Sequence, residues 1–501
     1  MEKSLKKNKR KITERLGDSA DIIIREFKIG PHPKTSAAVI YTDGLTDTQS
    51  VQKFIMESLL FEFKVENNLK DDSEKETDSL LEQLKNVVLT VGELKEVNDL
   101  EDLLVSLLSG NVILLLDGYA EGFDIGLKEW ENRGVTETSS ESVVRGPKES
   151  FTESIRTNTA LIRRKIKDPN LWMENRVIGR VTKTDVTIMY IEGIVDDGVV
   201  EEVRRRLDRI DIDGIFESGY IEELIQDEAI TPFPTLYNSE RPDVIAAGIL
   251  EGRVAILVDG TPFVLLAPAL FVQLFQAAED YYGRSGVSSA LRILRYACFM
   301  IAFLVPSFYL AITTFHQEMI PTELLFSLIA QRERISFPAV IEVLLMEIAF
   351  EILREASLRM PKAVGSAISI VGTLVIGQAA VEAGLVSATL IIVVSITAIA
   401  SFVFPANDLS IATRLLRFPL IILASTLGLF GIVFGVIMLI VHLCSLRSFG
   451  VPYMSSIAPY IKENQKDTFV RLPYWLMWTR PKLIGRKNLI RNQTPKPKPP
   501  V

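Results

Sequence analysis

Long uncharged runs between residues 296 and 446 constrain the fold more than any other feature. The runs 296–315, 383–407 and 418–446 hold 20, 25 and 29 residues without a charged side chain, and 363–381 holds 19. An α-helix rises about 1.5 Å per residue, so each run can cross roughly 30 Å of hydrocarbon. A soluble core helix rarely has this length, and four of them in one chain are harder still to explain that way. We therefore predict four membrane spans at these positions.

The segment 321–360 is harder to assign because ten charged residues interrupt its apolar stretches. At 100° per residue, four of them share one helical face, opposite an apolar face that contains Leu345 and Ile352. Two interpretations stay open: an interfacial amphipathic helix, or a water-lined or inter-subunit helix that partly enters the membrane. The charged face consists of Glu347, Glu351, Arg354 and Glu355.

Basic residues beside the spans predict their orientation. Arg284, Arg292 and Arg295 precede the first span, and the tail after Leu446 holds eleven Lys and Arg against two acidic residues. Because basic flanks stay in the cytoplasm, both ends of the membrane region should lie inside, which requires an even number of crossings. Four spans satisfy this if 321–360 does not fully cross.

Small and polar residues within the spans suggest close packing or a water path. Gly431 and Gly435 in the last run favour helix packing within the subunit. Polar groups at membrane depth tend to face a bundle interior or an aqueous path. For the second run, a pore-lining role and ordinary packing both stay open; the pore-lining candidates are Ser366, Ser369, Thr373, Gln378 and Glu382.

The region before the spans contains an internal repeat. The stretch 38–47 aligns with 187–196, each an apolar strand that ends in an acidic-Gly turn, and 109–118 aligns with 251–260. The two copies keep the same order and lie about 145 residues apart. This pattern predicts two related α/β subdomains, with Asp117-Gly118 and Asp259-Gly260 as hairpin turns.

The predicted fold class is therefore an α/β N-terminal region of two related subdomains plus a polytopic all-α transmembrane domain. The predicted order is a basic tail at 1–20, subdomain 1 at 21–130, a linker at 131–150, subdomain 2 at 151–290, the transmembrane domain at 291–446, and a basic cytoplasmic tail at 447–501.

Several functional classes find no support in the residues. The two cysteines, Cys298 and Cys444, both sit in apolar runs, and three isolated histidines offer no ligand spacing. Asp211 and Asp213 form an acidic pair, but they lie in a turn-prone stretch where acidic residues are common. Phosphate-binding loops and nucleophile elbows are absent from the sequence. We expect no catalytic site, no cofactor, no metal and no nucleic-acid partner.

Two long motifs resemble one known family. The first, 231–264, begins Thr231-Pro-Phe-Pro and contains Glu-Arg-Pro-Asp-Val-Ile-Ala-Ala-Gly-Ile-Leu-Glu-Gly-Arg-Val-Ala-Ile-Leu-Val-Asp-Gly. The second runs Pro361-Lys-Ala-Val-Gly-Ser-Ala-Ile-Ser-Ile-Val-Gly-Thr-Leu-Val-Ile-Gly-Gln-Ala-Ala-Val-Glu-Ala-Gly-Leu-Val-Ser387. Both resemble the A subunit of GerA-type spore germination receptors, from about Asp21 to the end of the chain. One departure is Thr235, where many members of the family carry glutamine.

The resemblance implies a subunit of the spore inner membrane, with both termini cytoplasmic, that works with a transporter-like B subunit and a lipoprotein C subunit. Such receptors sense small nutrients and start germination. The A subunit is thought to form a homo-oligomeric ring with a gated ion path, and the family offers no catalytic site. Two alternatives stay open: a secondary transporter that binds the nutrient itself, which would usually show inverted repeats, or a membrane-anchored adaptor that assembles the receptor.

Overall fold

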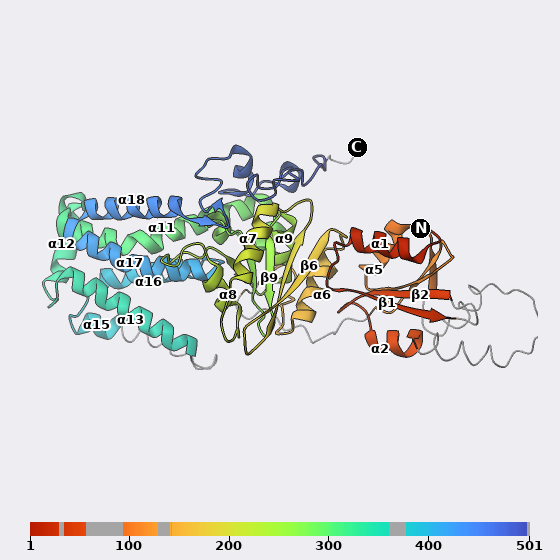
Figure 1. Cartoon of the computed structure of the whole chain (residues 1–501). Coiled ribbons are helices and arrows are strands. Elements are labelled where there is room, and N and C mark those ends of the chain that lie inside the picture. The colour runs from red at the N-terminus through yellow and green to blue at the C-terminus, as the bar shows by residue number, and fades with distance from the viewer. Residues whose placement is uncertain (30–34, 57–93, 129–140, 142, 360–376, 498–501) are drawn as a thin grey trace, which may run out of the picture.

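Three parts follow one another along an elongated molecule in the computed structural model. Figure 1 shows a small α/β subdomain at the N-terminal end, a second α/β subdomain in the middle, and a helical bundle at the other end. The structure describes residues 1–29, 35–56, 94–128, 141, 143–359 and 377–497.

Subdomain 1 is built on a five-stranded antiparallel sheet with the order β1-β2-β4-β5-β3. Alternate residues of β2 point to opposite faces, as the two-residue period of a strand requires. Ala38 and Ile40 join one core with α1 and α5, while Ala37 and Val39 join the core on the other face. The elements are α1 (Leu5–Arg15), β1 (Ile22–Ile29), β2 (Thr35–Thr42), α2 (Thr48–Ser50), a π-helical turn (Val51–Met56), β3 (Leu94–Val97), α5 (Leu100–Leu107), β4 (Val112–Leu116) and β5 (Gly122–Ile125).

Subdomain 2 repeats this plan. Its sheet has the order β6-β7-β9-β10-β8, and every neighbouring pair is again antiparallel. Helices α6 and α9 cover one face and α7 and α8 the other. The predicted repeat of two related α/β subdomains is confirmed. The elements are α6 (Ile155–Lys165), β6 (Leu171–Ile178), β7 (Thr184–Ile191), α7 (Asp197–Asp208), α8 (Ser218–Ile225), β8 (Tyr237–Ser239), α9 (Pro242–Leu250), β9 (Val254–Val258) and β10 (Val264–Ala267).

The two Asp-Gly turns occupy equivalent places in the subdomains. Gly118 and Gly260 have φ values of +94° and +92°, the left-handed region that favours glycine. The preceding aspartates accept hydrogen bonds from the first backbone N–H of a helix, Asp117 from Leu5 at 2.9 Å and Asp259 from Ile155 at 3.0 Å. The predicted turns thus also anchor helices α1 and α6.

The predicted basic tail at 1–20 is wrong, because this segment forms α1 and completes subdomain 1. Leu5, Ile12 and Leu16 are buried against the sheet, while the basic side chains between them lie on the outer face. The density of lysine and arginine hid this helical period. In place of a tail, residues 1–20 supply the counterpart of α6.

The subdomains are joined by a buried ion pair. The guanidinium of Arg163 on α6 donates to the carboxylate of Asp21 at 2.7 and 3.0 Å, and to the hydroxyl of Ser19 at 2.9 Å. Arg163 is 1% exposed and Asp21 is 3% exposed. Residues 143–150 of the predicted linker lie against subdomain 2, where Pro147 accepts a hydrogen bond from Arg241.

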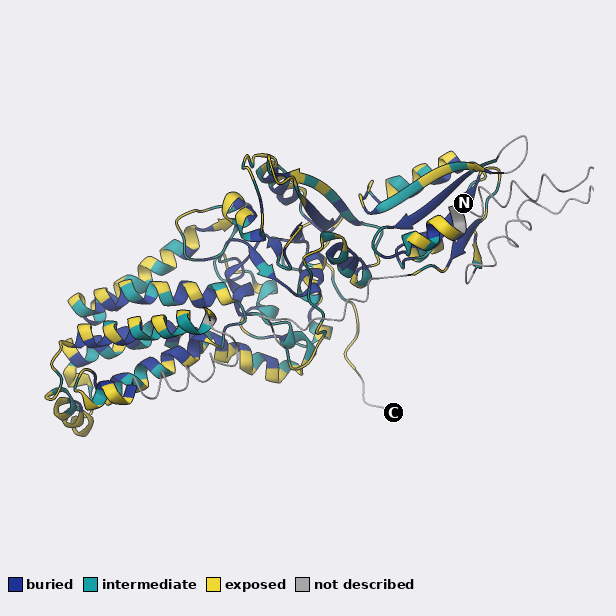
Figure 2. Ribbon diagram, turned by 90° about the horizontal axis from the view of Figure 1, so that it is seen from below, coloured by how far each residue is buried: buried dark blue, intermediate teal, exposed yellow. Residues whose placement is uncertain are grey.

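The helical bundle extends away from subdomain 2. Two of its described helices, α11 and α17, are long and apolar enough to cross a membrane, and α16 and α18 are shorter apolar helices. Figure 2 shows exposed residues along the outer faces of these helices and buried residues between them. The helices are α11 (Ser285–Phe315), α12 (Thr322–Arg332), α13 (Ala339–Arg359), α15 (Gly377–Glu382), α16 (Ala388–Ser401), α17 (Asn407–Leu427) and α18 (Leu429–Ser445).

The predicted single span at 418–446 is wrong. The chain reverses at Gly428, which has a φ of +60°, so the run is divided between the end of α17 and the whole of α18. No charged residue interrupts the run 418–446, so the sequence pattern gave no sign of this turn. The packing prediction for Gly431 and Gly435 is confirmed: a methyl group added at Gly431 would clash with the backbone of Leu423 on α17.

The other predicted spans differ in extent. The run 296–315 forms the second part of α11, which begins eleven residues earlier at Ser285. In the run 383–407 the helix α16 covers only 388–401, and Asn407 already begins α17. Most of the predicted span 363–381 lies outside the described residues.

The C-terminal segment, predicted as a basic cytoplasmic tail at 447–501, makes contacts with subdomain 2. Lys487 pairs with Glu192 and Asp197, and Arg486 pairs with Asp196, all near the start of α7. Ser448 donates to the buried backbone carbonyl of Thr235 at 2.6 Å. The basic residues therefore match acidic groups of subdomain 2, over which this segment lies (Figure 1).

Candidate functional site

Charged residues of α13 point into the bundle and form ion pairs with α17. The carboxylate of Glu347 lies 2.5 Å from a guanidinium nitrogen of Arg417, and both side chains are at most 2% exposed. One turn further along, Glu351 pairs with Arg414. Arg354 lies over the ring of Phe402, 5.5 Å from its centroid, at the end of α16. The buried Glu347–Arg417 pair holds the two helices in one register, since breaking it would leave an unpaired charge in the interior.

The opposite face of α13 is apolar and exposed. Four side chains spaced three or four residues apart are 37–63% exposed: Ile341, Leu345, Ile348 and Ile352. A soluble amphipathic helix buries its apolar face and exposes its charges. In α13 this arrangement is reversed, which suits a helix with lipid or another subunit outside the bundle. Of the predicted charged face, Glu355 stays exposed and pairs with Arg359.

Helix α13 is antiparallel to α11. Its first turns pack at Val343 against Leu310 near the end of α11, whereas Arg354 reaches Ser410 at the start of α17. Glu342 also stabilises the bundle, because its carboxylate accepts a hydrogen bond from the backbone N–H of Ser387, the residue that caps α16. The segment 321–360 thus contains a helix that runs beside the apolar helices.

The structure describes two of the five pore-lining candidates. Gln378 and Glu382 both lie on α15, are exposed, and share a hydrogen bond of 3.0 Å. Ser366, Ser369 and Thr373 lie outside the described residues. The pore-lining role of all five stays a prediction.

The root of the bundle, where α11 leaves subdomain 2, is held by buried ion pairs. Asp280 accepts hydrogen bonds from Arg292 at 3.0 and 3.1 Å and from Arg295 at 2.7 and 2.9 Å. Arg292 also contacts Asp467 of the C-terminal segment at 2.7 Å. Two of the arginines expected to mark the cytoplasmic flank are therefore structural partners, which their position in the sequence did not reveal.

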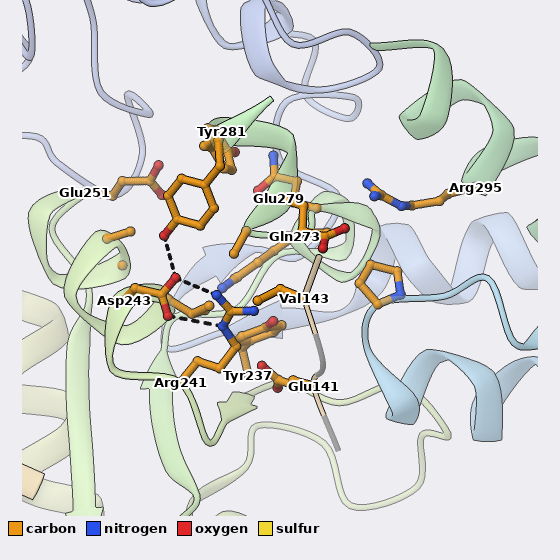
Figure 3. A pocket seen from close by; sticks show the side chains of 18 of the residues that line it. Glu141, Val143, Tyr237, Arg241, Asp243, Glu251, Gln273, Glu279, Tyr281 and Arg295 are labelled. Atoms are coloured by element: carbon orange, nitrogen blue, oxygen red, sulfur yellow. Dashed lines mark hydrogen bonds and ion pairs between the residues drawn. The ribbon is translucent and has the colours of Figure 1, made fainter. Parts of the chain in front are cut away.

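A cavity of about 390 Å³ lies between subdomain 2 and this root. Figure 3 shows the Arg241–Asp243 ion pair on one side of it and Arg295, from α11, on the other. Burial raises the pKa of Glu141, which also lines it, to about 7, although the hydroxyl of Ser239 donates to this carboxyl. The cavity joins charged groups that lie far apart in the sequence.

A second polar contact connects subdomain 2 to the bundle. Asn238 on the edge strand β8 donates to Asp408 at the start of α17 at 2.9 Å. Burial, together with repulsion from Asp408 and Glu217, raises the pKa of Glu222 to about 7. Sequence reasoning missed this contact, and it missed the partners of Glu347 and Glu351. One signal was present in the sequence. Arg414 and Arg417 lie three residues apart, and Glu347 and Glu351 lie four residues apart, so each pair of like charges falls on one face of its helix.

Comparison with known proteins places the chain in a family. The sequence model described as "Bacillus/Clostridium GerA spore germination protein" matches residues 10–483. The chain belongs to the GerA family. Spore germination protein KA of Bacillus subtilis (strain 168) is 49% identical over 99% of this chain and 90% of its own length. Spore germination protein GerLA of Bacillus cereus is 37% identical over 96% of this chain and 95% of its own.

A solved structure also matches this GerA-family chain. It is the crystal structure of the N-terminal domain of the A subunit of the Bacillus megaterium spore germinant receptor GerK3, with 46% identity. The match covers 54% of this chain and 97% of that one, with a TM-score of 0.43. The family match over residues 10–483 and the relatives of similar length confirm, at the level of the family, the resemblance found in the sequence motifs.

Proposed function

We propose that this GerA-family chain is the A subunit of a nutrient germinant receptor in the spore inner membrane, and that it couples nutrient sensing to germination as an oligomeric ligand-gated ion channel. The observation that carries the proposal is the reversed arrangement of α13. Its ion pairs with α17 lie inside the bundle while isoleucine and leucine side chains cover its outer face. A helix with charged side chains inside the bundle and apolar side chains outside it suits a bundle that is surrounded by lipid and has a polar interior.

The topology proposed for the channel is multi-pass with both termini on the cytoplasmic side. The positions of two chain segments support it. Subdomain 2 precedes α11, and the C-terminal segment after α18 packs on the same subdomain through Lys487 and on the start of α11 through Asp467. Both lie at one end of the bundle (Figure 1), as an even number of crossings requires.

The proposed partners are a transporter-like B subunit, a lipoprotein C subunit, membrane lipid and further copies of this chain. A ring of copies is part of the proposal because a single bundle of this size encloses little space for an ion path. The exposed apolar face of α13 offers a surface for lipid or for a neighbouring copy.

Conductance of the purified full chain in planar bilayers tests the channel. We expect Ser369→Trp and Thr373→Trp to lower ion flux at least tenfold and to block germination. The matched control is Ile392→Trp, because Ile392 lies on the outer face of α16 and is 60% exposed. Unchanged flux in the first two variants would overturn the pore assignment.

The same preparation separates the alternatives. A secondary transporter would accumulate labelled nutrient in vesicles without a unitary conductance. An adaptor would conduct nothing, and its soluble region expressed together with the B and C subunits would restore assembly and signalling. Determination of the oligomeric state comes first, since a monomer in the membrane would contradict the ring.

A further inference from the structure

The cavity between subdomain 2 and the bundle root has the size and lining of a small-molecule site. Its volume of about 390 Å³ falls in the range of known ligand pockets, roughly 300–1,000 Å³. Its walls include residues of α9, of the segment 273–282 and of the C-terminal segment, together with Arg295 of α11 and Phe404 in the turn before α17. A molecule bound there would touch both the soluble subdomain and the membrane helices.

Three buried arginines line the cavity and retain unused hydrogen-bond donors. Arg241, Arg253 and Arg295 are 2%, 3% and 8% exposed. Arg295 makes its hydrogen bonds, to Asp280 and to the carbonyl of Phe275, through Nη1 alone. Its Nε and Nη2 have no hydrogen-bond partner within the described part of the chain. A planar guanidinium with free donors in a sheltered cavity is well suited to a carboxylate.

The other two arginines point to the same chemistry. Arg241 uses Nε and Nη2 for Asp243 and the carbonyl of Pro147, which leaves Nη1 without a partner among the described residues. The buried Nε of Arg253 also lacks a partner there. Burying a charged donor without a partner is costly, and a ligand carboxylate would remove that cost.

Acidic groups line the same cavity and extend the chemistry it can recognise. Glu141, Glu251 and Glu279 are among its lining residues. The cavity therefore presents negative as well as positive side chains. A ligand with a carboxylate and an amino group could use both, whereas an amine alone would leave the arginine donors unpaired.

The internal repeat shows that the fold itself does not require these arginines. The segments 109–118 and 251–260 align with a constant separation of 142 residues, and the helices before them, α5 and α9, keep the same separation at their starts. At the positions of Arg241, Asp243 and Arg253, subdomain 1 carries Asp99, Glu101 and Asn111. The same helix thus begins with Asp99 as an ordinary cap in subdomain 1, where its side chain accepts the N–H of Glu101. Of the two copies, subdomain 2 alone therefore carries arginine at the positions of Arg241 and Arg253.

We propose that this cavity is a binding site for a small carboxylate of amino-acid size, whose carboxylate is held between Arg241 and Arg295. The ligand joins α9 of subdomain 2 to α11 of the bundle. Binding at this site does not depend on ion conduction, so the proposal stands or falls separately from the channel.

Three probes that share a propyl chain test the chemistry: L-norvaline, pentanoate and butylamine. Each is titrated into the purified full chain in detergent, with binding followed by calorimetry and by saturation-transfer NMR of the probe. We expect L-norvaline and pentanoate to bind and butylamine not to bind. Binding of butylamine as tight as that of pentanoate, or no binding by either carboxylate, overturns the proposal.

A substitution that fills the cavity tests whether the ligand binds there. Ala247 lies on the exposed side of α9 and lines the cavity, so Ala247→Trp fills it while no ion-pair residue is replaced. Leu250→Trp is the matched control, because Leu250 lies on the same helix, is 40% exposed and is not part of the cavity lining. We expect at least a tenfold loss of pentanoate affinity in the first variant and none in the second. Equal affinities in the two variants contradict the assignment.

Removal of one guanidinium tests the contact itself. Arg295→Gln removes the free donors, while Asp280 keeps its hydrogen bonds from Arg292. We expect pentanoate affinity to fall at least tenfold in a variant that stays folded through the remaining Arg292–Asp280 pair. An unchanged affinity overturns the role of Arg295, and Arg295→Lys, which keeps the charge but not the fork, should recover only part of the loss.

Discussion

The two α/β subdomains share one strand order and the same helix anchors, yet they differ in what covers one face of the sheet. In subdomain 1 the face under α1 and α5 is closed by residues of that subdomain, such as Ile12 and Leu104. In subdomain 2 the core on the corresponding face continues through Phe271 and Phe275 to Phe299 of α11. The same scaffold is thus a self-contained unit in one copy and the base of the bundle in the other.

The difference rests on few residues. The strand order needs only alternating apolar side chains and tight turns, and both copies supply these. Attachment of the helical bundle to subdomain 2 also needs aromatic residues after β10, the ion pairs of Asp280 and the polar contact of Asn238 on the edge strand. A repeat can therefore keep its topology while one copy acquires a new partner surface.

The largest expected effect is at the junction of the two copies. Arg163→Met leaves Asp21 buried without its ionic partner, which should lower the free energy of unfolding by about 3–5 kcal/mol. The control is Arg156→Met on the same helix, whose pair with Asp43 is exposed, with an expected loss of at most about 1 kcal/mol. Thermal unfolding of the full chain in detergent measures both. Similar losses in the two variants would mean that the buried pair does not hold the copies together.

The contact of subdomain 2 with α17 should make stability depend on pH. The pKa of Glu222 is about 7 in the folded protein, through burial and repulsion from Asp408 and Glu217, against 4.5 ordinarily. The folded state therefore holds this proton more tightly, so its stabilising contribution is complete below pH 4.5 and is lost as the pH rises to 7.

Glu222→Gln should remove this part of the pH dependence. We expect the variant to be about 1–3 kcal/mol more stable than the wild type at pH 8 and similar to it at pH 4.5. Unfolding midpoints between pH 4.5 and 8 measure the difference, with the exposed neighbour Glu223→Gln as the control. A constant difference between the variant and the wild type at all pH values would contradict the shifted pKa.

A smaller effect, of the same size at both sites, is expected at the two aspartates that anchor α1 and α6. Asp117→Ala and Asp259→Ala each remove the acceptor for the first N–H of a helix, α1 or α6, at a cost of about 1 kcal/mol. Asn at either position keeps an acceptor and should recover most of the loss. Unequal costs, read from the unfolding midpoints, would show that the repeat is less symmetric in energy than in topology.

The smallest effect is expected at an exposed ion pair outside the shared scaffold. Arg180 pairs with Asp211 at 2.6 Å beside the turn between β6 and β7, and both side chains are more than 60% exposed. Solvent screening makes such pairs weak. Arg180→Gln should leave the unfolding midpoint unchanged within error, and a clear shift in thermal unfolding would give this turn a structural role.

Local patterns in the sequence predicted the repeat, the Asp-Gly turns and the helical character of the C-terminal part. Each depends on residues that are close in the chain: a strand period, a glycine with positive φ, or a run of apolar side chains. The same locality explains the failures. The basic surface of α1 hid Leu5, Ile12 and Leu16, and the uncharged run 418–446 concealed the reversal at Gly428.

By itself, the sequence determined which segments are apolar, which repeat and which carry charge. Only the tertiary structure decided where the charges of α13 point, because Glu347 and Arg417 are 70 residues apart and their pairing depends on how α13 and α17 pack. The same holds for the cavity, which Arg241 of subdomain 2 and Arg295 of the bundle line from opposite sides. Periodicity assigns a residue to a face of its helix, but long-range packing determines what that face contacts.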